Sequence, residues 1–296
     1  LAREAIQKNA TVPQKFDETR RWEDRGRFGR EPETRAGLTS YLKRGYVACD
    51  RTAESVSRTL DFSFADRNRN YTNLWNAAAR RFLPRKANGE WDLSAQGAYT
   101  ECNADTALWC VPHDVKGLVA LLGGPAAFER ELDRYFDESF FRPNAQGSSF
   151  HGNEPTHHTA YLYNRIGKPE KTQRRVRDIL TKCYSSNRRG FDGNEDCGAM
   201  SAWYVFSALG LYPLDPVSGE YEIGSPLVKS AQIGKLRIKV NGYSPERYRV
   251  KSVMLDGNPI TNWKIRHEDI VKGGELVFEM CNKEDLLEER MVNDRL

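Results

Sequence analysis

Two acidic residues stand between glycines in the stretch Gly193-Asn-Glu-Asp-Cys-Gly-Ala-Met-Ser-Ala-Trp-Tyr204, directly before an apolar segment. The two acids, Glu195 and Asp196, lie near the N-terminus of a predicted helix, where an ionised carboxylate is stabilised. From the spacing alone, capping of this helix by Asp196 is favoured, and catalysis by the same carboxylate is the alternative. The predicted helix has one apolar stripe, which consists of Met200, Trp203, Phe206 and Leu209.

A second polar stretch is His151-Gly-Asn-Glu-Pro-Thr-His-His158. Thr156 is of a type that caps helices, so a helix is predicted to begin there. Glu154, His157 and His158 are three and four residues apart near its first turn. Such a set can bind a metal or hydrogen-bond a polar substrate, but a single E-x-x-H on a helix is also a common structural pattern. A dinuclear carboxylate site would need a second motif of this kind, which the sequence lacks.

A third stretch, Ala98-Tyr-Thr-Glu-Cys-Asn103, precedes an apolar run that includes Trp109. A carboxylic acid beside aromatic surface can have a raised pKa and act as a general acid at neutral pH. Glu101 is the candidate, although a single Glu near a Trp in sequence is more often structural. Taken separately, none of the three stretches decides the function.

The chain between residues 115 and 211 shows the periodicity of helices. Apolar stripes run from Phe128 to Phe140 and from Val176 to Cys183. Pro125 stands where a helix could start, and Gly167 and Gly210 are typical of helix ends. The short connections between these stripes predict antiparallel helical hairpins.

After Pro213 the pattern changes to alternating apolar and polar residues, which indicates strands with one buried face. Strands are predicted at Lys235–Val240, Val250–Leu255 and Glu275–Met280. We therefore predict a helical body followed by a small antiparallel β-sheet. Because 296 residues exceed the usual size of a single core, two domains are expected, a helical domain at residues 1–213 and a sheet segment at residues 214–296.

The composition argues against two classes of partner. The formal charge is only +4, and the Arg-rich stretch Arg20–Arg35 is interleaved with acids, which indicates a solvated face and no nucleic-acid site. No apolar run approaches the roughly 18 to 20 residues that span a bilayer. The six cysteines contain no C-x-x-C pair, which argues against a thiolate metal cluster.

Weak signals favour a secreted protein. The sequons Asn9-Ala-Thr11 and Asn70-Tyr-Thr72 would accept glycans in the secretory pathway. The chain begins with Leu1, so a secretory signal could have been lost upstream. The sequence does not indicate an oligomeric state.

Together, the three stretches and their flanks resemble the C-terminal region of the calcium-dependent, inverting α-mannosidases of glycoside hydrolase family 92. The resemblance implies an N-terminal β-sandwich, an (α/α)6 barrel and a C-terminal sheet, of which this chain is expected to contain the barrel and the sheet. Ser63-Phe-Ala-Asp66 runs straight into Arg67-Asn-Arg-Asn70, where the family has more chain, so one barrel helix is expected to be missing. Further matching segments are Gly45-Tyr-Val47, Ser55-Val-Ser-Arg-Thr59, Val111-Pro-His-Asp-Val115, Ser218-Gly-Glu-Tyr221 and Gly273-Gly274.

The resemblance also implies roles for the two candidate carboxyl groups. By position in the motif, Glu101 is similar to the general acid that protonates the glycosidic oxygen. Asp196 is similar to the general base that activates water. In an inverting enzyme such groups are expected about 6.5 to 9.5 Å apart, which leaves room for the water.

Calcium is the cofactor that the resemblance implies, in contact with the mannose hydroxyls. A hard cation needs oxygen ligands, so Asn153 and Glu154 are the expected metal ligands. His157 and His158 are then expected to hydrogen-bond the sugar, because imidazole suits softer metals. The other expected substrate contacts are Asn103 and Glu195.

Several residues depart from the family pattern. Glu101 is followed by Cys102-Asn-Ala-Asp-Thr106, where the family usually has Gly-Asn-Ala-Trp-Gln. The added Asp105 could raise the pKa of Glu101 or bind the cation in its place. Other departures are Asn194 for an acid, Ala199 for Gln and Cys281 for Gly.

We predict an exo-α-mannosidase that trims terminal mannose from glycans or glycoproteins by single displacement with inversion. The alternative is a non-catalytic carbohydrate-binding homologue or an inactive fragment, which the changed residues 102, 105 and 106 favour. A purely helical scaffold for protein partners is opposed by the retained Glu101, Asp196 and His157-His158 pair.

Overall fold

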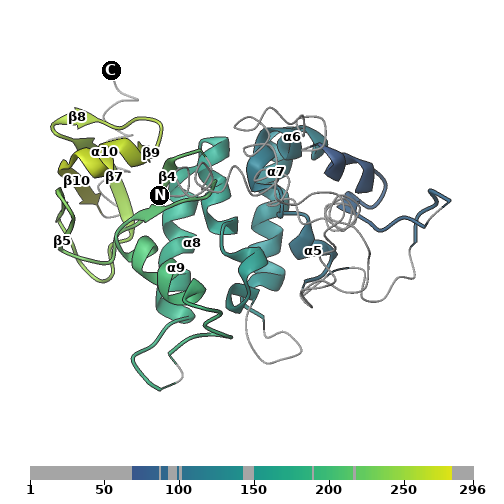
Figure 1. The fold of residues 1–296 in the computed structure, drawn as a ribbon, viewed down its shortest axis with the longest axis horizontal. Helices are drawn as coiled ribbons and strands as arrows, with labels where there is room; N and C mark the ends of the chain where they lie inside the picture. Colours follow the sequence, from purple (N-terminus) through teal and green to yellow (C-terminus); the bar gives the residue numbers. More distant parts are fainter. Residues whose placement is uncertain are drawn as a thin grey trace, which may run out of the picture. The chain divides into compact units, whose positions relative to one another are not determined.

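The structure is a computed structural model in which residues 69–86, 88–92, 99, 102–142, 150–188, 190–215 and 218–281 are described. Contacts between Cα atoms divide the chain into two compact units, Leu1–Leu122 and Gly123–Leu296. Figure 1 shows the described helices and strands, coloured along the sequence. The division at residue 213, which the change of sequence pattern after Pro213 suggests, stays a prediction. The stretches Arg20–Arg35 and 45–66, the sequon at Asn9 and the candidate acid Glu101 lie outside the described residues.

Short elements around buried aromatic side chains make up the described portion of the first unit. The Tyr71 hydroxyl donates a 2.7 Å hydrogen bond to Asp114. The other oxygen of Asp114 accepts the Gly117 amide at 2.9 Å, which caps helix α6. The elements in chain order are η3 (Asn70–Leu74), β1 (Trp75–Asn76), β2 (Arg81–Phe82), α5 (Ala104–Ala107), η4 (Pro112–Asp114) and α6 (Val115–Leu121).

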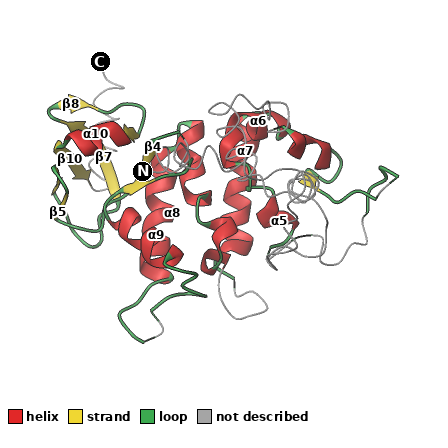
Figure 2. Ribbon diagram, viewed as in Figure 1, coloured by secondary structure: helices red, strands yellow, loops and turns green. Residues whose placement is uncertain are grey.

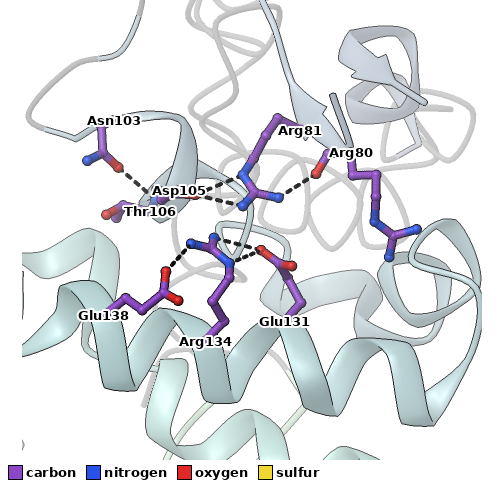
Figure 3. A network of polar contacts seen from close by, with 8 residues as sticks. All are labelled: Arg80, Arg81, Asn103, Asp105, Thr106, Glu131, Arg134 and Glu138. Atoms are coloured by element: carbon purple, nitrogen blue, oxygen red, sulfur yellow. Dashed lines mark hydrogen bonds and ion pairs between the residues drawn. The ribbon is translucent and has the colours of Figure 1, made fainter. Parts of the chain in front are cut away.

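Helix α7 (Pro125–Tyr135) opens the second unit and confirms the first predicted stripe. It begins at Pro125, as predicted, and continues as one π-helical turn, η5 (Phe136–Phe140). Arg134 pairs with Glu131 at 2.7 Å and with Glu138 at 3.1 Å along the helix surface (Figure 3). The stripe residues Phe128, Leu132, Tyr135, Phe136 and Phe140 are all 0–1% exposed.

The second predicted stripe and both predicted helix ends are also confirmed. Val176, Ile179 and Leu180 are buried on one face of α8. Gly167 ends the preceding helix in the left-handed conformation, although that helix is 3-10 and not α. Gly210 has φ 80° directly after α9. The segments are η6 (Phe150–Gly152), η7 (Glu154–Thr156), η8 (Thr159–Ile166), α8 (Pro169–Lys182) and α9 (Ala199–Ala208).

The C-terminal strands form two sheets, seen in yellow in Figure 2. The smaller sheet has the order β3-β4-β9 and the larger one β5-β6-β10-β7-β8. The three predicted strands are confirmed as β6, β7 and β10. The elements are β3 (Leu211–Tyr212), β4 (Glu220–Ile223), β5 (Ser230–Ile233), β6 (Leu236–Asn241), β7 (Arg249–Leu255), β8 (Asn258–Pro259), β9 (Lys264–Arg266), α10 (His267–Lys272) and β10 (Gly274–Cys281).

The prediction of an antiparallel sheet is wrong for one pairing. Strands β6 and β10 run parallel, with Gly274 opposite Leu236 and Glu279 opposite Asn241. A parallel pair needs a long crossover, and here the chain passes through β7, β8, β9 and α10 before it returns as β10. The larger sheet is therefore mixed, because its other pairings are antiparallel.

Helix α8 attaches the larger sheet to the helical segments through backbone groups. The Gln173 side chain accepts the Val250 amide at 3.0 Å and donates to the Val250 carbonyl at 3.5 Å. One turn later, Arg177 donates to the carbonyls of Pro226 at 2.6 Å and Pro245 at 2.9 Å. Within the second unit, helices and sheet thus share a buried polar interface. Among the described residues, no helix has both the length and the apolar content to cross a membrane.

Candidate active site

Asp196, the predicted base, lies on a left-handed turn. Asp196, Cys197 and Gly198 have consecutive φ values of 48°, 58° and 94°. A residue with a Cβ loses about 1–2 kcal/mol in this conformation, although Asp adopts it more readily than most. Asp196 and Cys197 are both exposed, so burial of their side chains does not offset this cost. Backbone strain of this kind clusters at functional sites.

The structure does not support the interpretation that the Asp196 side chain caps the following helix. Helix α9 has Gly198 as its N-cap residue, with no side-chain cap from that position. Asp196 contributes only its carbonyl, which accepts the Ala199 amide at 3.2 Å. The Glu195 side chain accepts the Ser201 amide at 3.2 Å instead. Capping thus belongs to Glu195, and the Asp196 carboxylate stays exposed.

The His151–His158 stretch is not the start of an α-helix. Two short 3-10 segments, η7 and η8, replace the predicted helix, and the hydroxyl of Thr156 donates to the Asn153 carbonyl at 2.9 Å. Glu154 is exposed, whereas His157 and His158 are only 8% and 9% exposed. The spacing of Glu154 from the histidines therefore does not place them in a common environment.

Two histidines of this stretch are held neutral. Burial lowers the pKa of His157 to about 4, against smaller opposing effects of its hydrogen bond to the His151 carbonyl and of Asp196. Burial also brings the pKa of His151 well below its ordinary value. Because a carbonyl only accepts, the 3.1 Å contact with His151 O requires the proton of His157 on Nε2. Asp196 raises the pKa of His157 electrostatically, so the two stretches lie close enough for their charges to interact.

Trp203 and Tyr184 connect the two stretches. The Trp203 indole donates a 2.8 Å hydrogen bond to the His157 carbonyl, and the ring is 2% exposed. The Tyr184 hydroxyl lies 2.9 Å from His151 Nε2 and 3.1 Å from the Met200 carbonyl, to which it donates. Trp203 is thus a core residue, as its position on the stripe predicts. Sequence reasoning missed Tyr184, because no pattern separates it from the other aromatic residues near a helix end.

Two glycines allow the backbones of the stretches to touch. A Cβ on Gly193, whose φ is 110°, would lie 2.6 Å from the Cα of Gly152. A Cβ on Gly152 would lie 2.8 Å from the carbonyl carbon of Asp192. Real Cβ atoms do not approach backbone this closely, so both positions require glycine.

In the first unit, the residues after Glu101 are engaged in local structure. The Asn103 side chain caps α5 by accepting the Thr106 amide at 2.9 Å. One oxygen of Asp105 accepts two guanidinium N–H groups of Arg81, at 2.9 and 2.7 Å (Figure 3). Asp105 thus has a partner in Arg81 and needs no metal ion to balance its charge, which Arg81 partly neutralises.

The expected metal ligands have the type of donor atom that calcium binds. Asn153 and Glu154 offer amide and carboxylate oxygens, which hard cations prefer. Calcium takes about six to eight oxygen ligands, so these two side chains would need backbone carbonyls, water or substrate oxygens beside them. Over the described ranges, no group of three or more His, Cys, Asp and Glu residues is placed to hold a metal.

Comparison with known proteins gives a family match. The model of the glycosyl hydrolase family 92 catalytic domain matches residues 63–282. An uncharacterized secreted glycosidase of Arthroderma benhamiae is 27% identical over 340 residues, which covers 96% of this chain and 42% of the fungal protein.

Two solved structures from Bacteroides thetaiotaomicron are similar to this chain. A family GH92 α-mannosidase has a TM-score of 0.74 and 30% identity, covering 83% of this chain and 35% of that one. A family GH92 inverting mannosidase of strain VPI-5482 has a TM-score of 0.68 and 31% identity, covering 83% and 37%. This chain thus spans less than half the length of each of these relatives.

Proposed function

Because this chain belongs to glycosyl hydrolase family 92, we propose that it is the catalytic portion of an exo-α-mannosidase that releases terminal α-linked mannose from glycans with inversion. The family and the mannosidase structures support a glycosidase. The observation that carries the proposal is the exposed Asp196 carboxylate on its strained turn, beside a neutral His157. A general base needs an oxygen that water can reach.

The proposed mechanism uses two carboxyl groups. Asp196 takes a proton from the attacking water, and Glu101 donates a proton to the leaving glycosidic oxygen. In the same single displacement, the water oxygen bonds to the anomeric carbon as the glycosidic C–O bond breaks, which inverts the anomeric configuration. The proposal requires about 6.5 to 9.5 Å between the two carboxyl groups for the water.

Further side chains are proposed to bind the sugar. The proposed hydrogen-bond partners of the mannose hydroxyls are His157, His158 and the side-chain N–H groups of Asn103. A neutral imidazole can accept from a hydroxyl through its unprotonated nitrogen, which is Nδ1 in His157 because Nε2 carries the proton. The lowered pKa of His157 supports this role at pH values above about 4, where the imidazole is neutral.

Calcium would be held by Asn153 and Glu154. Bound there, the cation would polarise sugar hydroxyls and favour a distorted ring. We also propose the (α/α)6 barrel of the family for the helical segments, and secretion for the protein, by analogy with the secreted fungal relative.

The test is mannose release from an α-linked mannobiose by the 296-residue chain, with and without a calcium chelator. We expect turnover that the chelator abolishes, and Asp196→Asn and Glu101→Gln should each lower kcat about 10²- to 10⁴-fold. Asp178→Asn, which changes a surface partner of Lys182 on α8, is the control and should leave kcat unchanged. Proton NMR of the fresh product reports its anomer, and a retained anomer would exclude the assigned roles.

The alternative is a carbohydrate-binding homologue without turnover. The engagement of Asn103 and Asp105 in local hydrogen bonds favours it, because both follow the proposed acid. Calorimetric binding of mannose by a folded chain that releases no product would establish this alternative.

A further inference from the structure

We infer that Glu195 is a positioning residue, whose carboxylate caps α9 and holds the left-handed turn that presents Asp196. This inference rests on the proposed role of Asp196 as the base. It replaces the expectation, drawn from the family resemblance, that Glu195 contacts the sugar.

Glu195 bonds to the first turn of α9 in two ways. Its side-chain Oε1 accepts the Ser201 amide at 3.2 Å, and its carbonyl accepts the Met200 amide at 3.3 Å. These bonds bracket the turn from Asp196 to Gly198, since Glu195 lies directly before it and both donors lie after it. Glu195 therefore connects the start of the Asp196–Gly198 turn to the first residues of α9, which follow its end.

The burial of the Glu195 carboxylate argues against contact with a sugar. Oε1 is occupied by the Ser201 amide. Oε2 is buried and has no hydrogen-bond partner among the residues that the structure describes. A substrate hydroxyl would need an oxygen that it can reach. Asp196, one residue later, is exposed instead.

The local chemistry explains why a carboxylate is needed. The first amides of a helix have no partner within the helix, and Gly198 at the N-cap has no side chain to accept from them. A negative charge near a helix N-terminus is favourable as well. The hydrogen bonds that Glu195 accepts from these amides thus offset some of the strain at Asp196 and Cys197.

The test compares two variants of the full chain. Glu195→Gln keeps an oxygen that can accept the Ser201 amide, whereas Glu195→Ala removes it. For Glu195→Gln we expect kcat within about 3-fold of wild type. For Glu195→Ala we expect kcat about 10- to 100-fold lower with KM nearly unchanged, because a small displacement of a catalytic group costs rate. Glu268→Ala, which removes an exposed carboxylate from α10, is the control.

Hydrogen exchange of the Ser201 amide gives a readout that does not depend on activity. Its exchange should become about 5- to 10-fold faster in Glu195→Ala, the effect of losing one hydrogen bond, and stay slow in Glu195→Gln. If Glu195→Ala does not fold, Glu195→Asp, whose shorter side chain misses the amide, should show the same faster exchange.

Two results would overturn the inference. The first is unchanged Ser201 exchange in Glu195→Ala or, should that variant not fold, in Glu195→Asp. The second is a tenfold rise in KM in both Glu195→Gln and Glu195→Ala, which would indicate a sugar contact. A wild-type chain without turnover would refute the proposed function alone, since the exchange measurement would still decide whether Glu195 is the cap.

Discussion

The two stretches that form the candidate site are built in opposite ways. In the first, His151, His157 and His158 are buried: His151 lies in η6, and His157 and His158 form the turn between η7 and η8. In the second, Asp196 and Cys197 are exposed and their backbone is strained. The difference teaches that each environment suits the chemistry of its side chains: burial keeps the imidazoles of His151 and His157 uncharged, whereas exposure leaves the Asp196 carboxylate accessible to solvent.

The largest expected effect breaks the contact between the stretches. Gly193→Ala should lower the free energy of unfolding by about 3 kcal/mol or more. The new Cβ would clash with the Gly152 backbone, and alanine is strained at a φ of 110°. Gly167 has a smaller positive φ of 72° and open space around the position of a Cβ, so Gly167→Ala should cost only about 1 kcal/mol. Urea unfolding of both variants measures the difference, and equal losses would show that the close approach is unimportant.

The next effect tests the neutral histidines. The pKa of His157 is about 4 in the folded protein and 6.5 in a free side chain, so between these values the unfolded state binds a proton that the folded state does not. Stability should therefore fall as pH falls from about 6.5 toward 4, by at most about 1.4 kcal/mol per pH unit for this group. His157→Gln should reduce that slope. A slope that is unchanged in the variant would contradict the assignment.

A smaller effect concerns the hydrogen bonds that connect the stretches. Tyr184→Phe leaves His151 Nε2 and the Met200 carbonyl without the hydroxyl, which should cost about 1–2 kcal/mol. Tyr204→Phe, a neighbouring ring whose hydroxyl takes part in neither bond, is the control. Thermal unfolding separates the two variants, and equal midpoints would mean that Tyr184 acts through its ring alone.

The smallest effect has the opposite sign. Cys197→Gly should stabilise the chain by up to about 1 kcal/mol, because glycine adopts the left-handed conformation without strain. Ala202→Gly, at an exposed position inside α9, should instead destabilise by about 1 kcal/mol. Destabilisation by both substitutions would show that the turn is unstrained.

The sequence predicts those elements whose burial repeats along the chain. Leu236, Ile238 and Val240 alternate with exposed residues, and that alternation is enough to identify β6. The direction of its partner β10 could not be predicted, since it depends on where the chain returns after three intervening strands and a helix. Strand periodicity is the same in parallel and antiparallel pairs.

The residues of the candidate site could be predicted from the sequence, but their backbone conformation could not. Motif resemblance identified Asp196 and the histidine pair as residues of interest. Asp followed by Cys gives no reason to expect two consecutive positive φ values, because Cys rarely adopts them and even Asp, which does so more readily than most residues, usually has a negative φ. Capping by Glu195 was therefore not predicted: its side chain accepts the Ser201 amide, whereas Asp196 lies on the left-handed turn.

The polar attachment of α8 to the larger sheet limits how the chain can be divided. Gln173 and Arg177 bind carbonyls and an amide, which are backbone groups, so the sheet can change many side chains without losing these bonds. Truncation after residue 213 would be different. It would strip the bonding partners from two buried polar side chains at once, and an isolated helical fragment would need a replacement surface or new residues at these positions.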